Sequence, residues 1–138
     1  MNWKLILLLS LFGLAMGVAT VFVIPSAVEP AFWLPIFVFC GVLIARMAKS
    51  QHFLHGVYLG LVNAFWVTGA HILFADRYLA THPSEANMMK NVFVMGGPRA
   101  TMAFTAPMIG VISGVVIGLF AVIASRFVKP VGGGAKPA

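Results

Sequence analysis

The order of apolar and polar residues divides the chain into four long hydrophobic segments joined by polar connections. The segments cover residues 5–24, 31–47, 53–75 and 100–127. A helix needs about 20 mainly apolar residues to cross a bilayer, and 31–47 falls short of that length, which leaves a re-entrant hairpin as its alternative. The pattern predicts an all-α fold, an integral membrane bundle of four transmembrane helices formed by a single domain of residues 1–129.

The polar connections are short, with the exception of residues 76–99, which we expect to form an external loop. Within it, the stretch THPSEANMMKN combines a cap-like Thr81 with an early proline and an early Glu85, a pattern typical of a short helix. Residues 130–138 are rich in glycine and predict a flexible C-terminal tail.

Composition supports a membrane protein. Of the 138 residues, 61% are apolar and 9% are charged, whereas a soluble domain carries roughly 25% charged residues. The net charge of +6 comes from basic residues at the ends of the hydrophobic segments and not from one patch. Such positions are typical of topology signals and of lipid headgroup contacts. We therefore expect the lipid bilayer as a partner and no nucleic acid.

The basic residues also predict an orientation. With the N-terminus in the cytoplasm, six basic residues are inside and three are outside, which agrees with the positive-inside rule. The inside set is Lys4, Arg46, Lys49, Arg126, Lys129 and Lys136, and the outside set is Arg77, Lys90 and Arg99. This bias predicts that both termini are cytoplasmic. The small chain carries no recognisable organelle address, so we expect a bacterial inner (plasma) membrane with multiple passes.

Small residues mark the predicted packing faces of three helices. Helices in lipid associate through close packing, which small side chains permit. The last segment contains two overlapping GxxxG motifs, formed by Gly110, Gly114 and Gly118. The first segment carries a similar pair in Gly13 and Gly17, and the third carries one in Gly56 and Gly60. We predict that these three helices form the core and that segment 31–47 is peripheral. The partner of the last helix could be this chain, a second copy in a homo-oligomer, or another membrane protein.

Three polar residues interrupt the third segment in the stretch GLVNAFWVTGAH. Exposing Asn63 or His71 to lipid would cost several kcal/mol of unmet hydrogen bonding, so both should face the bundle. One interpretation is structural: Asn63 bonds a neighbouring helix and Thr68 bonds its own backbone. The other is functional: Asn63, Thr68 and His71 line a polar path in which His71 accepts protons.

Metal, cofactor and catalytic chemistry find little support. His52 and His55 are one turn apart but lack further ligands, and the outer set of His71, Asp76, His82 and Glu85 matches no ligand spacing. The methionines near residues 88–102 are better explained by lipid contact than by copper. We therefore expect no metal, no cofactor and no enzyme activity.

Three functions remain open. The leading hypothesis is a structural or accessory membrane protein that associates through the Gly110/Gly114/Gly118 face. The second is a small oligomeric channel or carrier with a path lined by Asn63 and His71. No hydrophobic segment contains an acid, and small multidrug-resistance exporters, although similar in size, carry a glutamate in their first helix. The third is a membrane sensor that uses the outer loop 76–99.

Overall fold

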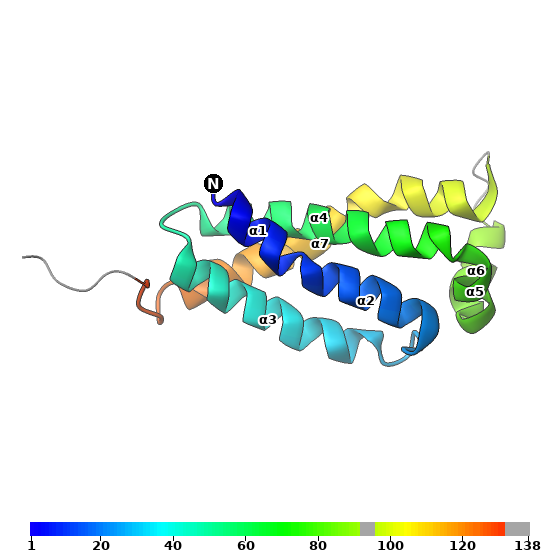
Figure 1. Cartoon of the computed structure of the whole chain (residues 1–138), viewed down its shortest axis with the longest axis horizontal. Helices are drawn as coiled ribbons and strands as arrows, with labels where there is room; N and C mark the ends of the chain where they lie inside the picture. Colours follow the sequence, from blue (N-terminus) through cyan, green and yellow to red (C-terminus); the bar gives the residue numbers. More distant parts are fainter. Residues whose placement is uncertain (92–95, 132–138) are drawn as a thin grey trace, which may run out of the picture.

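The computed structural model describes residues 1–91 and 96–131, which form helices and turns without a strand. Seven helices follow one another in the described part: α1 (Trp3–Leu9), α2 (Leu11–Phe22), α3 (Glu29–Met47), α4 (His52–Leu73), α5 (Ala75–Thr81), α6 (Pro83–Asn91) and α7 (Gly97–Ala124). The expected all-helical fold is confirmed. Figure 1 shows the long helices side by side, with α1 and the end of α7 at one end of the bundle and α5 and α6 at the other.

Four helical stretches in the described residues are long and apolar enough to cross a membrane. They are Trp3–Phe22, Glu29–Met47, His52–Leu73 and Gly97–Ala124, and each covers most of one predicted segment. The second is one continuous helix of 19 residues, so the hairpin alternative for this segment is not observed. The first is interrupted at Ser10, which separates α1 from α2. Both Phe65 and Phe104 are at least 70% exposed, and this apolar exterior fits a multi-pass membrane protein.

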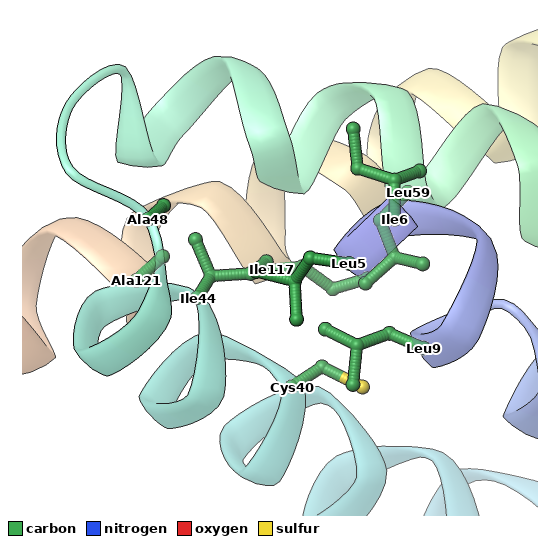
Figure 2. Packing of buried hydrophobic residues seen from close by; sticks show 9 residues of the cluster. All are labelled: Leu5, Ile6, Leu9, Cys40, Ile44, Ala48, Leu59, Ile117 and Ala121. Atoms are coloured by element: carbon green, nitrogen blue, oxygen red, sulfur yellow. The ribbon is translucent and has the colours of Figure 1, made fainter. Parts of the chain in front are cut away.

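The main core cluster lies in the half of the bundle that contains α1. Figure 2 shows its side chains pointing toward one another from α1, α3, α4 and α7, and from the α3–α4 connection: Leu5, Ile6, Leu9, Cys40, Ile44, Ala48, Leu59, Ile117 and Ala121. Cys40 and Ile44 of α3 are fully buried in this cluster. The prediction that segment 31–47 is peripheral is therefore wrong for the second half of α3, although Phe32 and Leu34 in its first half are exposed.

The connection 76–99 contains more helix than its sequence predicts. Helix α6 coincides with the expected short helix, but α5 was not predicted because Asp76 and Arg77 lie in its first turn. Thr81 ends α5 and donates to the carbonyls of Arg77 and Tyr78, so it is not a cap of α6. Residues 92–95 of the loop and 132–138 of the tail lie outside the described residues.

Candidate ligand-binding site

The closest helix pair is α4 with α7, and glycines allow the approach. A Cβ atom on Gly56 would overlap the backbone of Gly118, and one on Gly60 would overlap the backbone of Gly114 and the carbonyl oxygen of Gly110. All five glycines are buried. The glycine face of α7 is thus covered by α4 of the same chain, so it does not form a free surface for a partner.

Helix α2 packs on another face of α4 through its own glycines. A Cβ on Gly13 would lie 2.5 Å from Oδ1 of Asn63, and a Cβ on Gly17 would lie 2.9 Å from Cα of Val67. Gly41 of α3 comes equally close to α7, since its Cβ would lie 2.7 Å from Cβ of Phe120. Gly41 was not among the packing glycines that the sequence predicts.

A cavity of about 710 Å³ opens between α3, α4 and α7 in the half of the bundle next to α5 and α6. The end of the cavity near α5 and α6 is called its outer end, and the opposite end its inner end. Volumes of about 300–1,000 Å³ are typical of small-molecule sites. Its inner end includes Phe37, Asn63 and Ser113, and its outer end includes Glu29 and Glu85. The other lining residues are mostly apolar: Pro30, Trp33, Ala64, Val67, Thr68, His71, Tyr78, Met88, Met89, Thr101, Met102, Thr105, Met108 and Ile109.

Asn63 and Ser113 are the polar residues at the inner end of this cavity. The side chain of Asn63 lies against Gly13 of α2 and it lines the cavity, yet the residue is only 3% exposed. Neither Oδ1 nor Nδ2 has a hydrogen-bond partner within the described part of the chain. Leaving such groups unpaired costs about 1–3 kcal/mol each. The interhelical hydrogen bond that the structural interpretation assigns to Asn63 is therefore not observed among the described residues.

His71 differs from Asn63 because it has an interhelical partner. Its Nε2 lies 2.8 Å from Oγ1 of Thr20 on α2, and both groups are buried. The Thr20 hydroxyl also lies 2.9 Å from the carbonyl oxygen of Met16 in its own helix. Since a hydroxyl has one proton, both bonds form together when Thr20 donates to Met16 and His71 donates from Nε2. In the neutral imidazole, this arrangement leaves Nδ1 as an acceptor.

Aromatic rings extend from His71 toward the outer end. The rings of His71 and Tyr78 stack with centroids 3.9 Å apart, and those of Tyr78 and His82 stack at 4.2 Å. Burial raises the pKa of the Tyr78 phenol, and the charges of Glu29 and Glu85 raise it further. Tyr78 therefore keeps its proton near neutral pH and can donate a hydrogen bond at the cavity wall.

The charges at the outer end are not balanced around the cavity. Glu29 and Glu85 are half-buried in its wall, and Ser26 donates to Oε2 of Glu85 at 3.0 Å. No lysine or arginine is among the described residues that line it. Arg99 instead pairs with exposed Asp76 at 3.3 Å and lies outside the cavity wall.

The structure brings the three polar candidates of α4 to one cavity. Asn63, Thr68 and His71 all line it, but no hydrogen bond from Thr68 to its own helix is found in the described residues. The sequence analysis did not identify Glu29 or Tyr78 as site residues. Their signal was weak, because an acid and an aromatic residue beside an interface usually indicate only the membrane boundary.

Comparison with known proteins gives no assignment: no family model matches this chain, and neither the search of curated proteins nor that of solved structures gives a significant match.

Proposed function

We propose that this chain is a multi-pass membrane protein that binds a small, largely apolar molecule in the cavity between α3, α4 and α7. One observation carries the proposal: the buried, unpaired carboxamide of Asn63 lies at the inner end of a cavity of about 710 Å³. A ligand would fill the apolar space of the cavity. If the Asn63 side chain turned from Gly13 toward the cavity, a polar group of the ligand would also give its carboxamide a hydrogen-bond partner.

Packing in the other half of the bundle favours a binding site over an open channel. The main core cluster, which includes Leu59 and Ile117, occupies the other half of the bundle, on the inner side of Asn63. Tightly packed apolar side chains leave no room for water or ions. The proposal therefore replaces the open path of the channel hypothesis with a ligand site that opens toward the end of the bundle that holds α5 and α6.

The test uses triphenylphosphine oxide, which has an apolar body and one strong acceptor oxygen. We expect it to raise the thermal midpoint of the parent protein in dodecyl maltoside, and Asn63→Leu to abolish this rise. Without the probe, Asn63→Leu should unfold at the same temperature as the parent or higher, because it removes unpaired buried groups. The matched control is Asn87→Leu, an exposed position outside the cavity wall.

Two results would contradict the proposal. The first is no thermal shift of the parent up to the solubility limit of triphenylphosphine oxide. The second is a large loss of stability in Asn63→Leu without the probe, with unchanged stability in Asn87→Leu. The second result would mean that Asn63 holds helices together, as the structural interpretation expects.

The proposal includes a bacterial inner membrane as the location, with both ends of the chain in the cytoplasm. It is supported by the excess of basic residues on that side, and by α1 and the end of α7 lying at the same end of the bundle (Figure 1). In a Cys40→Ser background, a membrane-impermeant maleimide added to intact cells should label Asn87→Cys and not Lys49→Cys. The reverse pattern would overturn the orientation.

A further inference from the structure

We propose that the molecule bound in this cavity is an amphipathic organic cation, with its positive charge at the outer end between Glu29 and Glu85 and its apolar body among the aromatic and methionine side chains. This inference rests on the proposed function and adds the chemical class of the ligand. It is carried by the distribution of charge and of aromatic faces around the cavity.

The first argument is the sign of the charge. Glu29 on α3 and Glu85 on α6 approach the cavity from different helices, and both act electrostatically on Tyr78 in the same wall. With no lysine or arginine among the described lining residues, an anion would find no opposite charge there. Partly buried carboxylates interact with an opposite charge more strongly than they would in water, because the effective dielectric constant is lower.

The second argument is the local position of the basic residues. Arg99 at the same end of the bundle already bonds Asp76 and the carbonyl oxygen of Ile72. Arg77 and Lys90 are exposed and do not line the cavity. The two carboxylates of the wall are therefore not neutralised by these three cationic side chains and can attract a cation from outside.

The third argument is the surface offered to the rest of the ligand. Trp33 and Phe37 present aromatic groups to the cavity, and aromatic faces attract organic cations at close range. The wall of the cavity also includes Met88, Met89, Met102 and Met108. Methionine side chains are flexible and polarizable, so they adapt to ligands of different shape. The outer end suits the charge, and the apolar wall between the two ends of the cavity suits the apolar body.

The experiment compares three probes of similar shape in neutral dodecyl maltoside micelles by isothermal titration calorimetry. They are the cation tetraphenylphosphonium, the anion tetraphenylborate and neutral triphenylphosphine oxide. We expect tetraphenylphosphonium to bind most tightly. Glu85→Gln should weaken its binding on the order of tenfold and leave triphenylphosphine oxide unchanged. Asp76→Asn is the matched control, since it removes an acid at the same end that does not line the cavity.

Each outcome decides one proposal. If triphenylphosphine oxide binds but the cation is not preferred, or if Glu85→Gln and Asp76→Asn weaken the cation equally, the cation inference is wrong and the cavity holds a neutral apolar molecule. If none of the three probes binds, the proposed function itself fails. Binding of triphenylphosphine oxide by Glu85→Gln also reports that this variant is folded. A second variant, Glu29→Gln, should reproduce the loss for the cation alone.

Discussion

Replacing Gly60 with alanine tests the contact that organises the bundle. The new Cβ would overlap Cα and N of Gly114 and the carbonyl oxygen of Gly110. These are backbone atoms of α7, so no side-chain rotation relieves the overlap. An ordinary carbon–carbon contact needs about 3.5 Å, and restoring it would separate the two helices by about 1 Å or more.

The size of the effect follows from two opposing contributions. Overpacking costs about 1–3 kcal/mol, and the rigid backbone at this site favours the upper part of that range. Alanine regains about 0.5–1 kcal/mol because it is the better helix former. We therefore expect Gly60→Ala to lower the free energy of unfolding by about 2 kcal/mol.

Gly69 provides a matched control on the same helix. A Cβ there would meet nothing within 4 Å, so Gly69→Ala should be neutral or stabilising by up to about 1 kcal/mol. The assay is reversible unfolding of the parent and both variants in mixed micelles of dodecyl maltoside and dodecyl sulfate, followed by tryptophan fluorescence. Equal midpoints for Gly60→Ala and Gly69→Ala would refute the reasoning, because they would mean that α4 and α7 do not pack through backbone contact.

Three further predictions concern other contacts. In a double-mutant cycle, His71→Leu and Thr20→Val should couple by roughly 0.5–1.5 kcal/mol in thermal unfolding, and additive losses would argue against their hydrogen bond. Gly41→Ala should push α3 from α7 and accelerate maleimide labelling of buried Cys40; an unchanged labelling rate would contradict this contact. The raised pKa of Tyr78 means that the unfolded chain loses this proton first as pH rises. Stability should therefore fall above about pH 10, and Tyr78→Phe should reduce that fall in pH-dependent unfolding; equal falls in parent and variant would count against it.

The long helices could be predicted because they depend on local composition. An uncharged run of about 20 residues needs only its own backbone hydrogen bonds to be a helix in lipid. The break at Ser10 could not be predicted in the same way. Its hydroxyl donates to Leu7 of its own helix and accepts from the indole N–H of Trp66, and the second contact joins residues far apart in the sequence.

The site was predictable in its polar residues but not in its shape. The sequence indicated that Asn63 and His71 face the bundle, and Thr20, the partner of His71, follows Gly17 on the small-residue side of the first segment. The cavity depends on how far the first half of α3 stands from α4, which no local pattern encodes. The outer Glu29 could be assigned to this cavity only once that distance was known.

The glycine contact between α4 and α7 also has a consequence for biosynthesis. Ribosomes complete α4 before α5, α6 and α7 exist. The surface of α4 formed by Gly56 and Gly60 therefore has no partner helix when α4 is first made. Helix α2 is made before α4 and can cover another face of α4 through Gly13 and Gly17, but the surface at Gly56 and Gly60 stays uncovered until α7 is made. Nascent chains that stop after α6 should therefore leave this glycine surface of α4 without its partner helix, and the arrival of α7 is the step that covers it.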